Sequence, residues 1–503
     1  MTDIPSSEDS TRFNPTGTSG ELKRRSAHGA VLTLAVQLFK MVIQFCTQVA
    51  LARMLAPADF GLVAMVVPLI AAIQLLNDLG LSAAVVQRQT ISHGQLSALF
   101  WVNAAAGTLL ALLAVALGPW VADFYDQPQL VWIIAAMGSI LALSGLTTQQ
   151  MALMTRSMRF GTLATIDLAS VIVSMAAGII AAMAGLGFWA LVLMQVANGL
   201  TMLVLSWALS GWIPSRPRFQ RDLGSLLAFG GNVTAYNILG YLINNLHSVL
   251  IGAKLGPAAL GLYDRSYRLV FQPLWQTTTP ILRVAVPLLS RLTDREEEYR
   301  HTYLMLLAVT MVATVPGLTA TVALAHPLIT SLLGARWAEA APVFAWLSIA
   351  ALTLQLRQAA TWLYQSQDRT REQLRWGGAG SIAIILSYPI GLYWGGLVGV
   401  AMGAALSGLF IQNPLLWWNA TRHGPIRLRD FLSLAGMILI SATISALALR
   451  WLQTELGWAA LWQMILLVAA GYAIFFVLIA LTPRGRRLIG DLFDIARKLM
   501  PRR

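Results

Sequence analysis

The chain has 503 residues, of which 57% are hydrophobic and 11% are charged, and its formal net charge is +13. Soluble globular proteins carry about 25% charged residues, so this composition argues against a set of soluble domains and favours a polytopic membrane protein. The excess positive charge lies in short loops between apolar segments. That is the pattern of membrane topology, and it argues against a nucleic-acid partner.

Apolar segments of spanning length begin after a polar N-terminal stretch. We expect residues 1–28, whose first part is rich in Ser, Thr, Pro and Gly, to be a disordered cytoplasmic N-terminus. A helix that crosses a bilayer needs roughly 20 mostly apolar residues, so we predict an all-α fold with about fourteen transmembrane helices. In chain order the predicted helices are Ala30–Ala52, Phe60–Leu79, Leu96–Leu117, Leu130–Thr148, Leu163–Ala184, Phe188–Leu209, Leu226–Ala253, Leu260–Leu288, Tyr303–Leu324, Val343–Tyr364, Gly377–Tyr393, Leu397–Asn419, Phe431–Leu452 and Ala459–Leu481.

These helices group into two lobes and a terminal pair. We predict an N-lobe at residues 29–210 and a C-lobe at residues 225–420, each with six helices, joined by a basic cytoplasmic linker at residues 211–224. Residues 421–482 supply the last two helices. Residues 483–503 read as a basic amphipathic cytoplasmic tail that lies on anionic membrane lipids, and a partner-binding tail is the alternative.

The charges of the loops test this arrangement, because Lys and Arg mark the cytoplasmic side of short loops. The loops predicted to be cytoplasmic carry Arg88, Arg156, Arg159, Arg216, Arg218, Arg221, Arg291, Arg295, Arg300, Arg369, Arg371, Arg375, Arg422, Arg427 and Arg429. The opposite loops carry Arg53, Lys254 and Arg336. This alternation predicts that both termini are cytoplasmic and that the protein is a multi-pass protein of a bacterial inner membrane.

Two short motifs recur and indicate an internal repeat. The pattern Leu-x-Pro-x-x-x-Gly-Leu begins at Leu55 and again at Leu255, each time between the first two helices of a predicted lobe. Gly-Pro-Trp-Val at 118–121 is echoed by His-Pro-Leu-Ile at 326–329. Parallel repeats of this kind flank a central substrate cavity in many transporters, so a two-lobed transporter is the simplest interpretation.

Polar residues within the predicted helices form stripes at helical spacing, and several are cations, which are costly inside a membrane. We interpret the stripes as the lining of a positively charged, water-filled cavity that binds an anion. The alternative is that single amides, such as Gln44, Asn237 or Asn244, join helices through buried hydrogen bonds. The candidate substrate-binding residues are Lys40, Gln44, Asn237, Tyr241, Asn244, Arg265, Arg268, Gln272, Arg283 and Arg357.

Three acidic residues bear on this cavity. Asp264 lies one helical turn before Arg268, where an ion pair would neutralise part of the positive field. Asp78 and Asp167 are candidates for ion coupling, and ordinary placement near a helix end is the alternative for each. Arg450 lies near a helix end, so we expect its side chain to reach the membrane surface.

Several chemistries are excluded by the motifs that the sequence lacks. There is no GxxxxGK[ST] loop, so the chain is not predicted to hydrolyse ATP itself, and there is no HExxH. The single cysteine, Cys46, cannot form an internal disulfide, and no Cys/His cluster has metal-ligand spacing. We therefore predict no metal, no cofactor and no enzymatic activity.

The repeated Leu-x-Pro-x-x-x-Gly-Leu motif, the segment Arg156-Ser157-Met158-Arg159-Phe160 and the fourteen-helix layout resemble the Wzx-type polysaccharide flippases, particularly the WzxC-like branch. These belong to the superfamily that also contains the MATE exporters. The resemblance implies transfer of an undecaprenyl-diphosphate-linked oligosaccharide to the periplasmic leaflet by alternating access of two lobes, for exopolysaccharide, capsule or O-antigen synthesis. It also implies a polysaccharide polymerase and export machinery as partners. The family places cavity cations where Lys40, Arg265, Arg268 and Arg283 lie here, but the second helix lacks one.

Two other functions compete with a flippase. A small-molecule exporter coupled to H⁺ or Na⁺ could use the same fold, but it needs buried carboxylates, whereas the predicted helices hold mainly arginines inside the membrane. A polysaccharide polymerase or ligase would be expected to present a large outer loop with catalytic residues, and the longest outer loop here, around residues 326–342, is small. We therefore favour the flippase.

Overall fold

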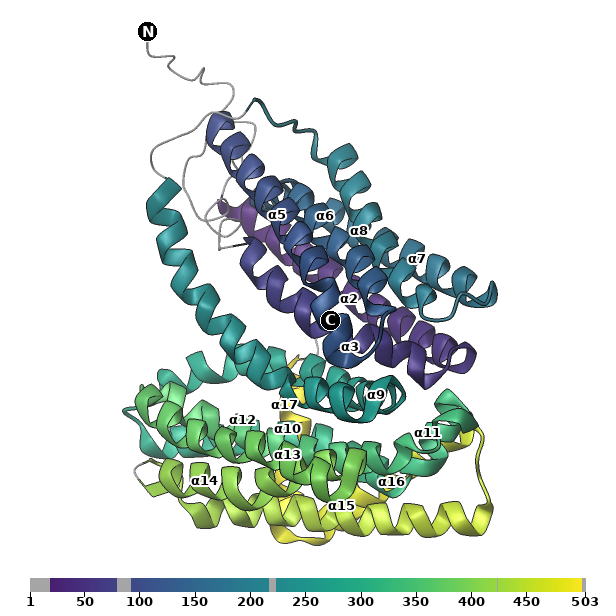
Figure 1. The fold of residues 1–503 in the computed structure, drawn as a ribbon. Helices are drawn as coiled ribbons and strands as arrows, with labels where there is room; N and C mark the ends of the chain where they lie inside the picture. The colour runs from purple at the N-terminus through teal and green to yellow at the C-terminus, as the bar shows by residue number, and fades with distance from the viewer. Residues whose placement is uncertain (1–18, 79–91, 217–222, 423, 500–503) are drawn as a thin grey trace. The chain divides into compact units, whose positions relative to one another are not determined.

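The computed structural model describes residues 19–78, 92–216, 223–422 and 424–499, and it describes no side chains for residues 19–35, 38, 77–78, 223–240, 242–244, 280 and 492–499. Every regular element in the described ranges is a helix (Figure 1). The chain divides into two compact units, Met1–Gly261 and Leu262–Arg503, hereafter unit 1 and unit 2.

Unit 1 is built from long helices that pack against one another in pairs. Its helices are α2 (Ser19–Met54), α3 (Pro57–Asp78), α5 (His93–Tyr125), α6 (Leu130–Arg156), α7 (Phe160–Met183), α8 (Trp189–Ser210) and the first part of α9 (Leu223–Ser290). Ser92 starts α5 through a capping box with Gln95, in which each side chain accepts a hydrogen bond from the other residue's backbone N–H. Helix α5 packs on α6, α7 packs on α8, and α2 packs on α7 (Figure 1).

Unit 2 continues from the second part of α9 and has a large core and a smaller second cluster of buried residues. Its helices are α10 (Glu296–Ala323), α11 (Ala325–Leu333), η1 (Ala335–Trp337), α12 (Ala340–Ser366), α13 (Thr370–Ser407), η2 (Gly408–Gln412), α14 (Asn413–Arg422), α15 (Leu428–Leu456), α16 (Leu461–Leu481) and α17 (Pro483–Leu499). Buried aromatic residues such as Tyr303, Trp362 and Phe475 hold this core together. Large apolar and aromatic side chains supply most of the burial free energy of such a core.

Each of the fourteen predicted segments falls within or closely overlaps a helix of the structure. Non-helical backbone at Gly256 in α9, and at Gly395 and Gly396 in α13, divides these two elements where separate helices were predicted. Among the described residues, ten helices are long and apolar enough to cross a membrane, and Thr370–Arg422 is one of them. A multi-pass, all-helical membrane protein is thus confirmed, while fourteen crossings and cytoplasmic termini stay predictions.

The two ends of the chain differ from the expectation in detail. Helix α2 begins at Ser19, so residues 19–28 are helical, in line with their Glu, Leu, Lys, Arg and Ala content. The rest of the predicted N-terminal segment lies outside the described residues. At the other end, the predicted tail is helix α17, in which Leu488 and Ile489 pack against the core of unit 2 while Arg486 and Arg487 are exposed.

Large exposed aromatic residues mark one end of several helices. Trp120 lies at the end of α5, Trp132 at the start of α6, Trp394 at the break in α13 and Trp451 near the end of α15. All four belong to the ends predicted to be outermost. Trp and Tyr gather at membrane–water interfaces because their rings are amphipathic, so these side chains fit an interfacial belt.

The two copies of the Leu-x-Pro-x-x-x-Gly-Leu motif contact each other within unit 1. A Cβ atom added to Gly61 would overlap the carbonyl oxygen of Pro257, and one added to Gly261 would overlap the carbonyl oxygen of Pro57. The contact is reciprocal, and it needs glycine at both positions because only glycine lets two backbones approach so closely. The repeated motif therefore marks the position where the start of α3 crosses the part of α9 that follows its break at Gly256.

A longer repeat relates α6 and the turn after it to α12 and the turn after it, and the spacing between the two copies stays constant. Helix α12 has the same length of 27 residues as α6 and begins 210 residues later. At the same offset, Met158 and Asp368 both adopt left-handed backbone, with φ of 53° and 56°. The next residue is an arginine in both copies. Its N–H donates to the carbonyl of the residue five positions earlier, at 2.9 Å for Arg159 and 2.8 Å for Arg369.

Each of these arginines also ties the turn to the end of a later helix. Arg159 Nη1 donates to the carbonyl of Ser210, the last residue of α8, at 3.2 Å. Arg369 Nη1 donates to the carbonyl of Ala420, at 3.3 Å, and Arg369 Nη2 to that of Asn419, at 3.2 Å, in the last turn of α14. We call this arrangement the arginine clip. It satisfies carbonyl groups that a helix end leaves without partners.

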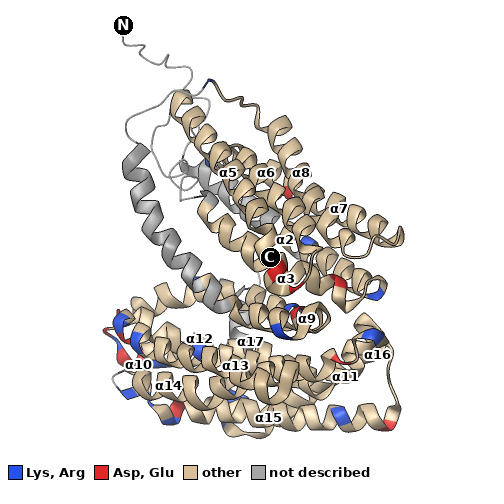
Figure 2. Cartoon of the chain, viewed as in Figure 1, with Lys and Arg blue, Asp and Glu red and all other residues tan. Residues whose placement is uncertain are grey.

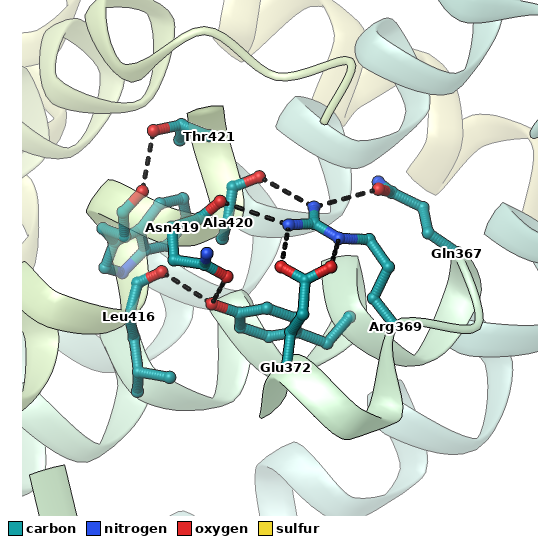
Figure 3. Close-up of polar contacts among 9 residues, drawn as sticks. Gln367, Arg369, Glu372, Leu416, Asn419, Ala420 and Thr421 are labelled. Atoms are coloured by element: carbon teal, nitrogen blue, oxygen red, sulfur yellow. Dashed lines mark hydrogen bonds and ion pairs between the residues drawn. The ribbon is translucent and has the colours of Figure 1, made fainter. Parts of the chain in front are cut away.

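The clip of unit 2 is the more extensive one (Figure 3). Glu372 accepts from Arg369 Nε at 2.9 Å and from Arg369 Nη2 at 2.6 Å, and the guanidinium lies 5.4 Å from the centre of the Tyr364 ring. The bonds to Glu372 raise the pKa of Arg369 further above its already high ordinary value. The Arg369 side chain is only 12% exposed, so these bonds are shielded from water and salt.

We expect Arg369→Ala to lower the stability of the protein by about 2–3 kcal/mol, because it removes the Arg369 hydrogen bonds to Glu372 and to two helix-end carbonyls. The melting temperature of the detergent-purified protein measures this. Arg371→Ala is the matched control, since Arg371 lies two residues later and is exposed. Equal melting temperatures for the two variants would contradict a structural role for the clip.

Candidate functional site

The charged residues of α9 that follow Gly261 form a compact cluster with one carboxylate at its centre. Asp264 accepts from Arg265 Nη2 at 2.9 Å and, through both of its oxygens, from Arg268 Nε at 2.9 Å. The Asp264 and Arg265 side chains are 16% and 12% exposed. The pair of Asp264 with Arg268 is the one predicted from their spacing, and Asp264 also binds Arg265.

Arg357, on α12, is a half-buried arginine on a second helix of unit 2. Figure 2 shows the basic and acidic residues of α9 next to each other, in helices that carry few other charges. We call the three residues that the side-chain contacts of Asp264 join, Asp264, Arg265 and Arg268, the arginine cluster.

An aromatic ladder runs along α9 from this cluster. Tyr263, Tyr267, Phe271 and Trp275 follow each other at intervals of four residues, and Tyr267 stacks on Phe271 with ring centres 4.4 Å apart. Trp275, at the far end, is exposed. Tyr267 was not among the predicted site residues, although its interval of four from Tyr263 and Phe271 was a readable signal.

Lys40 belongs to unit 1 and does not stand alone. Its Nζ lies 2.8 Å from Asp167 Oδ2, which joins α2 to α7 across 127 positions of sequence. The Lys40 side chain is 15% exposed. The sequence analysis assigned these two residues to separate roles, one in substrate binding and one in ion coupling. The structure brings them together as one ion pair.

The remaining candidate residues lie elsewhere along the chain. Arg283 is exposed and lies fifteen residues beyond Arg268, roughly 22 Å along an α-helix. Gln44 and Gln272 are half-buried. The Tyr241 carbonyl accepts from Asn245 at 2.8 Å. The side chains of Asp78, Asn237 and Asn244 lie outside the described residues.

The fold is shared with solved membrane transporters. A lipid II flippase MurJ, in its inward closed conformation, superposes with a TM-score of 0.69 at 12% identity, covering 91% of this chain and 100% of that one. A multidrug resistance MATE family transporter of the MOP superfamily, facing inward, gives 0.53 at 14% identity, covering 78% of this chain and 98% of that one. The chain thus has the fold of these two transporters, as the resemblance to the wider superfamily implied.

The family model described as "Polysaccharide biosynthesis protein" matches residues 50–342, and the chain belongs to this family. Lipopolysaccharide biosynthesis protein WzxC of Escherichia coli is 24% identical, with 76% of each chain covered. Teichuronic acid biosynthesis protein TuaB of Bacillus subtilis is 25% identical and covers 74% of this chain and 79% of its own. Succinoglycan biosynthesis transport protein ExoT of Rhizobium meliloti is 25% identical, over 92% of this chain and 93% of its own. The resemblance to Wzx-type flippases is confirmed.

Proposed function

We propose that the protein is a flippase that moves an undecaprenyl-diphosphate-linked oligosaccharide from the cytoplasmic to the periplasmic leaflet of a bacterial inner membrane. It acts as a transporter and not as an enzyme. Relatives named for lipopolysaccharide, teichuronic acid and succinoglycan synthesis support a glycan cargo, and the MurJ fold supports flipping. Fourteen crossings, both termini in the cytoplasm and alternating access of two lobes are parts of this proposal.

The observation that carries the proposal is the arginine cluster. It brings two guanidinium groups to one carboxylate on a helix that we predict to lie in the membrane, where an isolated cation is costly. A guanidinium presents a planar fork of donors that matches two phosphate oxygens, so the cluster suits a diphosphate better than a single point charge would. The aromatic ladder offers flat faces beside it, on which a prenyl chain or a sugar ring can pack.

A cation-coupled exporter of small molecules finds less support. Such an exporter needs a carboxylate that is free to bind a proton or a metal ion. Asp264 and Asp167, the two described carboxylates considered for this site, are both paired with cations. Arginine-rich helices favour an anionic cargo. A polysaccharide polymerase and export machinery would then act on the product at the outer leaflet.

The direct test is the pool of lipid-linked sugars in a deletion strain. We expect diphosphate-linked oligosaccharide to accumulate on the cytoplasmic side, protected from a glycan-modifying enzyme added to the periplasm, because transfer is the missing step. Mass spectrometry of the accumulated lipid would also name the glycan. An unchanged pool, with complete polysaccharide still reaching the surface, would contradict the flippase and favour a small-molecule exporter.

A further inference from the structure

The first turn of helix α17 holds this helix against the end of α16. Helix α16 is long and apolar enough to cross a membrane, and a single residue, Thr482, separates it from α17. The Thr482 hydroxyl accepts from the Gly485 N–H at 3.0 Å, and the Thr482 carbonyl accepts from the Arg486 N–H at 3.1 Å, which together cap the new helix. A Cβ atom added to Gly485 would overlap the carbonyl oxygen of Ile479, so the two helix ends pack backbone to backbone.

The two sides of α17 have different surroundings. Leu488 and Ile489 are half-buried and pack against the large core of unit 2. The exposed charged side chains of the described first turns are Arg484, Arg486, Arg487 and Asp491. Three positive charges and one negative charge give this exposed side a net charge of +2. The helix is thus fixed to the protein on its apolar side and presents positive charge on the other.

The same pattern continues in the sequence. Residues 483–503 contain six arginines and one lysine but only two aspartates. Leucine or isoleucine recurs at positions 488, 492, 495 and 499, which is helical spacing. A helix with one basic and one apolar side is typical of the interface between membrane and water, where anionic head groups attract Lys and Arg. Because α17 starts one residue after an apolar helix, it lies at the level of the head groups, and this place favours lipid over a soluble protein as its partner.

We propose that α17 is a docking surface for anionic phospholipid head groups, and that Arg484, Arg486 and Arg487 contact the lipid phosphates. The inference goes beyond the proposed function and does not depend on the cargo that the protein carries. Since Leu488 and Ile489 join α17 to the core of unit 2, lipid that binds this surface stabilises the folded protein. The melting temperature therefore reports lipid binding.

Two short-chain lipids of different head-group charge test the proposal on the full-length protein in a neutral detergent. Dioctanoyl phosphatidylglycerol is the anionic probe, and dioctanoyl phosphatidylcholine is its zwitterionic counterpart. We expect phosphatidylglycerol to bind about ten-fold or more tightly than phosphatidylcholine, because each basic residue near an anionic surface contributes about five-fold in affinity. High salt should reduce this preference, since exposed charges are screened. The rise in melting temperature along each lipid titration gives the two affinities.

The triple variant Arg484→Gln/Arg486→Gln/Arg487→Gln removes the positive charge and leaves the apolar contacts of α17 in place. We expect this variant to bind the two lipids within about two-fold of each other. The three side chains are exposed, so the variant should keep the melting temperature of the unchanged protein when no lipid is added.

The triple variant Arg371→Gln/Arg375→Gln/Arg422→Gln is the matched control, because it removes three exposed arginines from α13 and α14. We expect it to keep the preference for phosphatidylglycerol. An equal loss of preference in this control would show that positive charge in general selects the lipid, and it would overturn the assignment to α17. Equal binding of the two lipids by the unchanged protein would also overturn the proposal and would favour a protein partner for α17. Neither result bears on the flippase, which the pool of lipid-linked sugars tests.

Discussion

Valine at Gly61 is expected to abolish export and to leave little folded protein in the membrane. A Cβ at this position overlaps the Pro257 carbonyl, and the obstructing atoms belong to the backbone, so no side-chain rotation can relieve the clash. Inserting atoms into a packed interior typically costs about 1–3 kcal/mol of stability. Because the obstacle here is backbone, we expect a loss of stability at the upper end of this range or above it. The melting temperature and the membrane level of the variant measure the effect, together with surface polysaccharide.

Milder changes test whether the two copies of the motif form a single contact. Gly61→Ala and Gly261→Ala should each destabilise the protein, and the double variant should cost clearly less than their sum, because both act on the same crossing. Gly436→Ala is the control, since a Cβ there meets no other atom within 4 Å. Additive losses would mean that the two positions act independently, and a stable, active Gly61→Val would show that the helices do not cross this closely.

Replacing Arg268 by alanine is expected to reduce export about ten-fold or more while the protein remains inserted. The change removes one of the two guanidinium groups of the arginine cluster and leaves Asp264 with Arg265 as its described partner. Hydrogen bonds to charged groups contribute about 1.5–3 kcal/mol each, which corresponds to at least ten-fold in a binding constant. Export of newly made polysaccharide, normalised to the amount of protein in the membrane, is the measurement.

Arg450→Ala is the matched control for this prediction. Arg450 is also an arginine within an apolar helix, but it is exposed near the end of α15, so its loss should change export by less than about two-fold. Arg268→Lys adds a second comparison, because it keeps the charge and removes the planar fork of donors. Full export by Arg268→Ala would remove the arginine cluster from the binding site.

Hydropathy and spacing predict much of this molecule from its sequence. Lipid leaves backbone groups without partners unless they are helical, so apolar length alone locates the helices. The pair of Asp264 with Arg268 follows from a separation of four residues, which places the two on one helix face. In the sequence, the reciprocal glycine contact was visible only as a repeated motif. A sequence does not show which backbone segment packs against a given glycine.

Contacts between distant parts of the chain could not be predicted in the same way. Lys40 and Asp167 each look like an isolated membrane charge, and nothing in the spacing of α2 or α7 says that they meet. Sequence periodicity shows which residues share one face of a helix, but not which helix packs against that face. The polar stripes could therefore be predicted, whereas the ion pairs between residues of different helices could not.

The arginine clip affects how the orientation of this protein can be mapped. Basic loop residues are commonly neutralised or reversed to learn which side of a membrane a loop occupies. In this chain, Arg159 and Arg369 also hold helix ends, so changing them would disturb packing and insertion at once, and a misfolded variant would be mistaken for an inverted one. Arg371, which is exposed, reports the side of the membrane without that ambiguity. The same arginine side chains therefore serve both as orientation signals and as contacts that hold helix ends in place.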